Sequence, residues 1–196
     1  MFEVSRIGIA RGFSIFGHPM IMLPASALLV SLELGSVGRM FGVIGTAVLV
    51  SAGLGAWAKR KVAEGEWSHV DASDPAERLQ WNRVVFVSFI AVAALFAAFD
   101  SVIAVGSLAL AFIILCAMVL APWLKLSQHT AFTILSAWVA GAVDPIIGGV
   151  FALLSLGVMW SRLALDRHTV PEVIVGAICG SATGASLWWL ASKTIA

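Results

Sequence analysis

The run from residue 102 to residue 123, VIAVGSLALAFIILCAMVLAPW, contains no charged side chain. A helix needs roughly 20 apolar residues to cross the hydrocarbon core of a bilayer. Comparable runs recur along the whole chain, which is 60% hydrophobic and only 12% charged. Soluble domains rarely have such a composition. The sequence therefore predicts an all-α protein, a polytopic integral-membrane helical bundle in which residues 1–196 form a single domain.

Further apolar runs accompany this one. Their predicted limits are 13–34, 40–58, 83–99, 129–142, 145–163 and 171–190. We interpret residues 141–145 as a tight turn between two of them, because Asp-Pro favours turns. The count is then seven spans, or six if the first run only lies in the membrane interface.

Three polar segments separate the apolar runs, at 59–82, 122–128 and 161–171. Even numbers of spans lie between them, so alternating spans place all three on one face, where we expect the active site. All of the 12 Lys and Arg residues except Arg39 and Lys193 fall on that face. The positive-inside rule then predicts that the active site faces the cytoplasm. We expect a bacterial-type inner-membrane protein. The net charge of +1 argues against a nucleic-acid partner.

The stretch 161–172, SRLALDRHTVPE, concentrates reactive side chains between two apolar runs. Arg162 is followed by His168 after six residues, and Glu172 comes four residues later. Charged groups are costly at a membrane boundary unless they have a use. Together these three can bind an oxyanion, attack it and orient the attacking group. Because the surroundings are apolar, the predicted partner is a membrane lipid that carries phosphate.

A second polar stretch, 125–130, reads KLSQHT and precedes an apolar run. Free N–H groups and a positive dipole end make the start of a helix suitable for phosphate. His129 would then lie at the mouth of a phosphate site. The alternative interpretation of His129 is an anchor at the membrane interface.

These two stretches resemble signatures of the type 2 phosphatidic-acid phosphatase superfamily, which is related to the vanadium haloperoxidases. Residues 161–172, as Ser-Arg-x5-His-x3-Glu, are similar to its third signature, Ser-Arg-x5-His-x3-Asp. Residues 126–129, Leu-Ser-Gln-His, look like its second signature, Pro-Ser-Gly-His. The resemblance covers roughly 59–190 and includes the two apolar spans between the signatures.

The first signature of the family, Lys-x6-Arg-Pro, has the poorest counterpart. Aligning its arginine on Arg78 places Asp71 at the lysine position and Leu79 at the proline position. Lys125 or one of the cations at 59–61 could supply the missing charge. His69, Asp71 and Asp74 offer a less favoured interpretation, a divalent-metal site.

The resemblance implies an integral-membrane lipid phosphatase that hydrolyses an isoprenoid or glycerolipid phosphate or diphosphate through a phosphohistidine, without metal or cofactor. His168 would be the nucleophile, Glu172 would hold its other ring nitrogen, and His129 would serve as general acid and base. The expected phosphate ligands are Arg162, Arg78, Lys125, Ser127 and Gln128, with Ser161 and Asp71 as further candidates.

Two other functions remain open. One is a non-catalytic lipid-binding or assembly protein on a degenerate phosphatase scaffold, suggested by the poor first signature. The other is a small transporter, which lacks support because no span carries a central charge pair. The remaining notable residues have structural interpretations: a kink or interface feature at His18, packing at Cys116 and Cys179, and a close-packing helix face at Gly176, Gly180 and Gly184.

Overall fold

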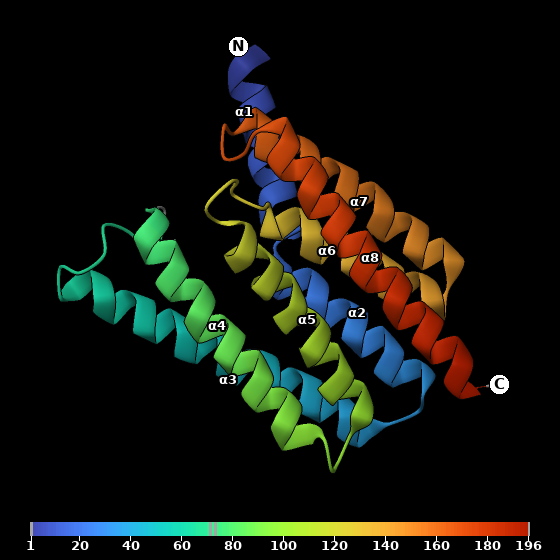
Figure 1. The fold of residues 1–196 in the computed structure, drawn as a ribbon. Helices are drawn as coiled ribbons and strands as arrows, with labels where there is room; N and C mark the ends of the chain where they lie inside the picture. The colour runs from blue at the N-terminus through green and yellow to red at the C-terminus, as the bar shows by residue number, and fades with distance from the viewer. Residues whose placement is uncertain (1, 71, 73, 196) are drawn as a thin grey trace.

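The computed structural model describes residues 2–70, 72 and 74–195, and over these it is all-helical (Figure 1). The helices are α1 (Phe2–Phe16), α2 (Pro19–Glu33), α3 (Val37–Ala63), α4 (Pro75–Phe96), α5 (Ser101–Leu120), α6 (Gln128–Val143), α7 (Pro145–Ala164) and α8 (Val170–Ile195). Helices α3, α4, α5, α7 and α8 are long and apolar enough to cross a membrane. These helices indicate an integral membrane protein, as predicted.

The first predicted span, 13–34, is wrong as a continuous helix. The chain instead forms α1 and α2, which are bent by 45° at residues 17–18 and could together make a sixth span. His18 has an extended backbone and caps α2, and Pro19 occupies its first turn. A residue that precedes proline is disfavoured in the helical region, so the break falls where the sequence places Pro19.

The predicted count of six or seven spans becomes five or six. Helix α6 has only 16 residues and does not reach the length of a span. The polar segment predicted at 59–82 is also mostly helical, because α3 continues to residue 63 and α4 begins at Pro75. Asp74 caps α4 by accepting from the Ala76 N–H at 2.8 Å, and proline is well suited to the first turn of a helix.

The predicted turn at 141–145 is confirmed. Asp144 ends α6 and caps α7, and its Oδ1 accepts from the N–H groups of Ile146 and Ile147 at 2.7 and 3.0 Å. Gly141 and Gly148 face each other across the turn, and a Cβ on Gly148 would clash with the Gly141 backbone. The two helices therefore form a tightly packed antiparallel pair.

The predicted close-packing face of α8 is also confirmed. A Cβ added to Gly176, Gly180 or Gly184 would collide with α6 or with Ser127, the residue that precedes α6. Small residues let two helix backbones approach closely. As a result the first turn of α8 lies against the start of α6, and the Ser127 N–H donates to the Glu172 carbonyl at 3.2 Å.

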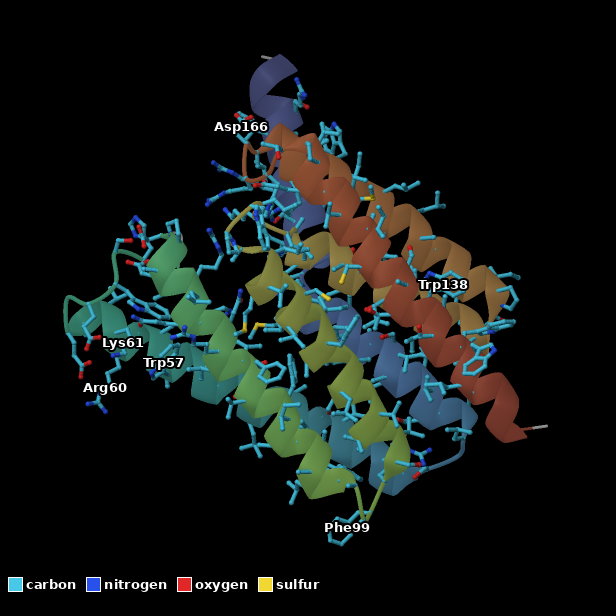
Figure 2. The ribbon with its side chains drawn as sticks, in the orientation of Figure 1. Trp57, Arg60, Lys61, Phe99, Trp138 and Asp166 are labelled. Carbon is cyan, nitrogen blue, oxygen red and sulfur yellow. The ribbon has the colours of Figure 1, made fainter. Side chains whose placement is uncertain are left out.

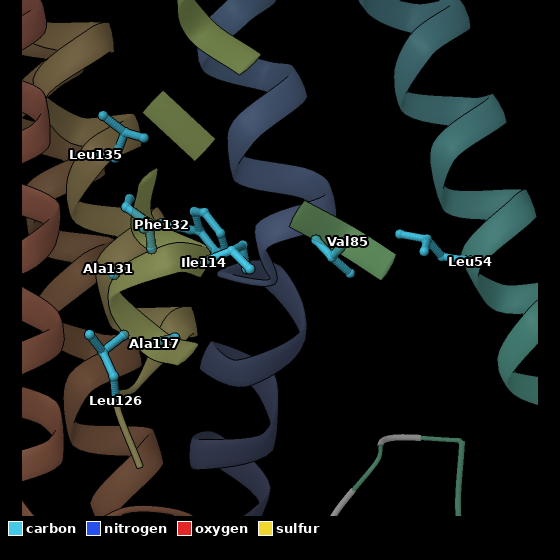
Figure 3. Packing of buried hydrophobic residues seen from close by; sticks show 9 residues of the cluster. Leu54, Val85, Ile114, Ala117, Leu126, Ala131, Phe132 and Leu135 are labelled. Carbon is cyan, nitrogen blue, oxygen red and sulfur yellow. The ribbon is translucent and has the colours of Figure 1, made fainter. Parts of the chain in front are cut away.

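The buried core joins α3, α4, α5 and α6 (Figure 3). Ile114 and Ala117 of α5 pack with Phe132 and Leu135 of α6, and Val85 of α4 belongs to the same cluster. A second cluster forms where α3 meets the α3–α4 connection. Its members are Ala58, Trp67 and Ala72, with Trp57, Val62 and Trp81 packed against them.

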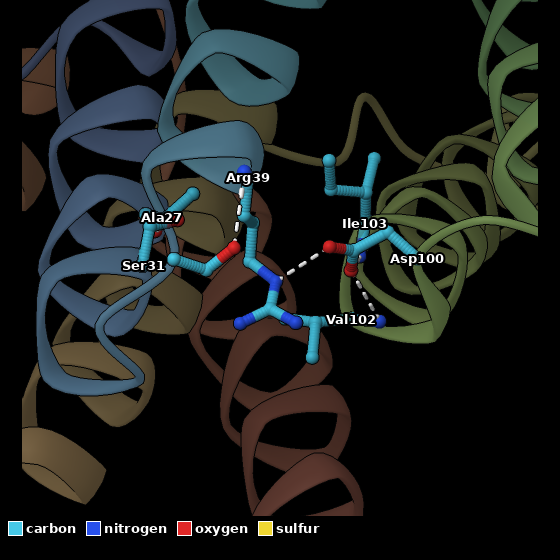
Figure 4. A network of polar contacts seen from close by, with 7 residues as sticks. Ala27, Ser31, Arg39, Asp100, Val102 and Ile103 are labelled. Carbon is cyan, nitrogen blue, oxygen red and sulfur yellow. Dashed lines mark hydrogen bonds and ion pairs between the residues drawn. The ribbon is translucent and has the colours of Figure 1, made fainter.

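A polar clasp ties α3 to α5 (Figure 4). The Arg39 Nε donates to Asp100 Oδ2 at 2.7 Å. The other oxygen of Asp100 accepts from the N–H groups of Val102 and Ile103 and so caps α5. Arg39 is thus neutralised by a structural partner and plays no part in the site described below.

The polar connections of the chain lie toward one end of the bundle. Figure 1 shows the α3–α4, α5–α6 and α7–α8 connections and the N-terminal end of α1 on that side, with the α2–α3 and α4–α5 connections opposite. This agrees with the predicted grouping of the three polar segments. The segments expected to carry chemistry therefore lie at one end of the bundle.

Candidate active site

The α7–α8 connection folds His168 back over the end of α7. The N–H groups of Arg167 and His168 both donate to the Arg162 carbonyl, at 3.0 and 3.3 Å. Asp166, which marks this connection in Figure 2, makes the reversal with a left-handed backbone, φ 51°. Glu172 then lies in the first turn of α8 and accepts from the Thr169 N–H at 2.9 Å.

Glu172 holds the His168 ring. Its Oε2 lies 3.2 Å from His168 Nδ1, and the His168 side chain is only 8% exposed. A carboxylate accepts hydrogen bonds, so this contact favours the tautomer with the proton on Nδ1. The lone pair of Nε2 is then available, which is the arrangement that a nucleophilic imidazole requires.

Glu172 also joins the two polar stretches that the sequence singled out. Its Oε1 accepts from the Lys125 N–H at 3.2 Å. The Lys125 Nζ in turn donates to the Arg167 carbonyl at 3.4 Å. Residues 47 positions apart in the chain are therefore fixed side by side through one carboxylate.

The charges around His168 keep its imidazole neutral. Burial, followed by the positive charges of Lys125 and Arg162, lowers the pKa of His168 from its usual 6.5 to about 4, and Glu172 opposes this shift. Burial and the cations Arg78, Arg162 and Arg167 likewise lower the pKa of Lys125. An excess of positive charge therefore surrounds a neutral imidazole, which is favourable for binding an anion beside it.

Arg162 is the most deeply buried of these cations, with 8% of the residue exposed. Its Nη1 donates to the Ser14 hydroxyl at 2.8 Å. Its Nε is a buried nitrogen without a hydrogen-bond partner, and no carboxylate among the described residues forms an ion pair with it. A buried charge is normally paired, so this guanidinium lacks an anion.

His129 lies in the first turn of α6, beside Ser127. Its ring contacts the ring of His18 edge to face, with the centroids 4.9 Å apart. Arg162 and His168 are also close enough to act on it electrostatically. The Ser127 side chain, at the start of α6, makes no capping hydrogen bond. Among the described residues no other side chain caps this helix, so its first N–H groups can donate to another acceptor.

The protein itself engages several of the other predicted ligands. Ser127 and Ser161 are fully buried. The Ser127 hydroxyl lies 3.0 Å from that of Thr130, and the Ser161 hydroxyl donates to the Val158 carbonyl at 2.7 Å. The Gln128 amide donates to Asn82 at 2.8 Å and so ties α6 to α4. These side chains therefore make hydrogen bonds within the protein that hold the elements of the site together.

Arg78 lies in the first turn of α4 and faces Lys125 across a small pocket. The pocket is lined by Arg78, Asn82, Ala117, Ala121, Leu124, Lys125, Leu126 and Gln128. The positive charge of Arg78 contributes to the lowered pKa of Lys125. Asp71, the residue aligned with the family's lysine, lies outside the described residues.

Two residues at this site were missed by the sequence-based reasoning. Ser14 lies in the last turn of α1 and His18 in the break that follows it, and each contacts a predicted site residue. The available signal was their spacing of four, which places two polar side chains near each other in an apolar stretch. Comparison with family models, curated proteins and solved structures finds no match to this chain.

Proposed function

We propose that the protein is an integral-membrane lipid phosphatase that works through a phosphohistidine. The observation that carries the proposal is Arg162, a buried guanidinium with an unpartnered Nε and no acidic partner among the described residues. A phosphate oxygen would supply both the missing charge and the missing acceptor. The neutral imidazole of His168, held by Glu172, lies next to this cation.

The first half of the reaction uses the three groups in distinct roles. The Nε2 lone pair of His168 forms a bond to phosphorus, and the bond from phosphorus to the lipid oxygen breaks. Glu172 stabilises the imidazolium that results. Burial and the positive charges of Arg162, His18 and His168 lower the pKa of His129 in the free protein, so His129 takes up a proton from water when the negatively charged phosphate enters the site. It then gives this proton to the departing lipid oxygen, which leaves as an alcohol or a lipid monophosphate.

The second half regenerates the enzyme. His129, now neutral, removes a proton from water while that water attacks phosphorus. The bond between His168 and phosphorus breaks, and inorganic phosphate leaves. Throughout, Arg162, Lys125, Arg78 and the free N–H groups at the start of α6 stabilise the non-bridging oxygens. Their combined positive charge offsets the negative charge of the phosphoryl group while it passes from the lipid to His168 and then to water.

The substrate in this proposal has an isoprenoid or acyl tail in the bilayer and a phosphate or diphosphate at the polar end. The apolar outer surfaces of the helices suit such a tail. Purified protein in detergent should release inorganic phosphate from at least one member of a panel of polyprenyl and glycerolipid phosphates, equally with and without EDTA. Tight binding of these lipids without any release would favour the non-catalytic lipid-binding protein, and release restored only by a divalent ion would favour a metal site.

Sidedness can be tested with a matched pair of variants. We propose that the site faces the cytoplasm, because most of the basic residues lie in the segments on the same membrane face as the site. Glu33 ends α2 and Glu64 follows the last residue of α3, and both carboxylates are exposed. Because α3 lies between them in the chain, the two residues are at opposite ends of this helix. With Cys116 and Cys179 replaced by alanine, a membrane-impermeant thiol reagent on intact cells should label Glu33→Cys and spare Glu64→Cys. The reverse pattern would place the site outside and change the expected substrate to an extracytoplasmic carrier lipid.

A further inference from the structure

The bend between α1 and α2 is fixed against α7 immediately before the candidate site. Gly17 is buried there, and a Cβ on it would collide with the Val158 side chain. The Phe13 ring occupies the space beside Gly157 in the same way. Arg162 follows Val158 by one helical turn, and its bond to Ser14 extends the same contact. The bend is therefore part of the wall of the site.

His18 has a defined orientation and protonation state in this bend. Its Nδ1 accepts from the Met20 N–H at 3.2 Å, which caps α2. A nitrogen that accepts a hydrogen bond carries no proton, so the ring is neutral with its proton on Nε2. Arg162 lies close enough to interact with it electrostatically, and this cation disfavours a second charge on His18.

The ring of His18 is the best-defined neighbour of the ring of His129. The two rings meet at an interplanar angle of 87° with centroids 4.9 Å apart, which is a favourable edge-to-face geometry. Within the described residues, the ring nitrogens of His129 make no hydrogen bond to the protein. His168 therefore has Glu172 to orient its ring, whereas the orientation of His129 depends on its contact with His18.

We propose that His18 is a positioning residue that holds the His129 imidazole toward the bound phosphate. The contact itself follows from the packing of α1, α2 and α6. Its effect on rate rests on the proposed function, in which His129 transfers the proton. A general acid that turns away from the leaving oxygen loses rate without losing substrate affinity, because the cations that bind phosphate are unchanged.

Two substitutions separate this role from the capping of α2. His18→Asn retains a good helix cap for Met20 and removes the ring, since asparagine is among the best N-cap residues. His18→Phe retains a ring against His129 and removes the cap. We expect His18→Asn to lower kcat by about tenfold with KM unchanged, and His18→Phe to keep most of the wild-type kcat. A wild-type kcat in His18→Asn with a reduced kcat in His18→Phe would show that His18 only caps α2, and would overturn the proposal.

A second readout does not depend on catalysis. The chain has 4 histidines, so each can be followed by NMR in micelles after selective histidine labelling, with exposed His69 as a control. His129 faces His18, Arg162 and His168. We expect His18→Asn to move the ring signals and titration of His129 and to leave those of His69 unchanged, as His69→Asn should leave His129 unchanged. Unmoved His129 signals in His18→Asn would refute the proposal. Shifted His129 signals in a protein that is inactive on every phosphate tested would uphold the contact and reject the phosphatase function.

Discussion

Replacement of His168 by alanine is expected to lower kcat/KM by about 10⁴-fold or more while the protein remains folded. The reason is that His168 forms the bond to phosphorus in the proposed reaction, whereas His129 serves there as the proton donor. The fold should survive, because Glu172 keeps its hydrogen bonds from the N–H groups of Thr169 and Lys125 when the imidazole is absent. The tie between the two polar stretches therefore does not depend on the ring.

The measurement combines phosphate release with trapping of the intermediate. Wild-type protein quenched with alkali after brief exposure to a ³²P-labelled lipid phosphate should carry an alkali-stable, acid-labile label, as a phosphohistidine does. His168→Ala should carry none. His69→Ala, at an exposed histidine in the α3–α4 connection, is the matched control and should behave as wild type. Robust turnover by a well-folded His168→Ala protein would remove this residue from the nucleophile role.

Replacement of Arg162 by methionine should separate stability from activity. Methionine fills a similar volume without burying a charge, so the protein without phosphate should become more stable, because an unpaired buried cation is costly. A gain of about 1 kcal/mol would raise the midpoint of thermal unfolding by about 2–4 °C in a chain of this size. Turnover should be lost, since the substrate phosphate loses its buried partner.

Orthovanadate tests the same residue without a lipid. It resembles a phosphoryl group in transfer, so it should raise the unfolding midpoint of the wild-type protein by binding the folded state. Arg162→Met should lose this stabilisation. Arg167→Met removes an exposed cation from the same connection and should keep it. A lower unfolding midpoint in Arg162→Met, together with retained vanadate stabilisation, would mean that Arg162 is a structural residue rather than the anion site.

Most of the features of the fold and the site that could be predicted follow from short spacings between residues in the sequence. The distance in sequence from His168 to Glu172 spans one turn into a new helix, and the two side chains meet as expected. The glycines four apart on α8 and the Asp-Pro at 144–145 also behave as their chemistry indicates. Each of these depends on contacts within one helix or between adjacent helices, where a period or a cap is visible in the sequence.

The N-terminal part of the site was not predictable in this way. Ser14 lies 148 positions from Arg162, and no pattern in an apolar stretch identifies which helix will pack beside it. The contact of His18 with His129 has the same origin, since it follows from the packing of the α1–α2 bend against α7 and of α2 against α6. The opposite error concerns Ser127, Ser161 and Gln128. The motif predicts them as phosphate ligands, but in the fold their polar side-chain atoms make hydrogen bonds within the protein.

The shortness of α6 has a consequence for the lipid itself. Its 16 residues extend about 24 Å, whereas the hydrocarbon core of a bilayer is about 30 Å thick. If Asp144 reaches one membrane surface, the other end of α6, with His129, remains recessed below the opposite surface. Such hydrophobic mismatch is relieved by local thinning of the bilayer or by a water-filled depression over the short helix. A phosphate headgroup would then sink toward the site while its tail stays in the membrane plane, and soluble phosphate esters without a tail should be poor substrates.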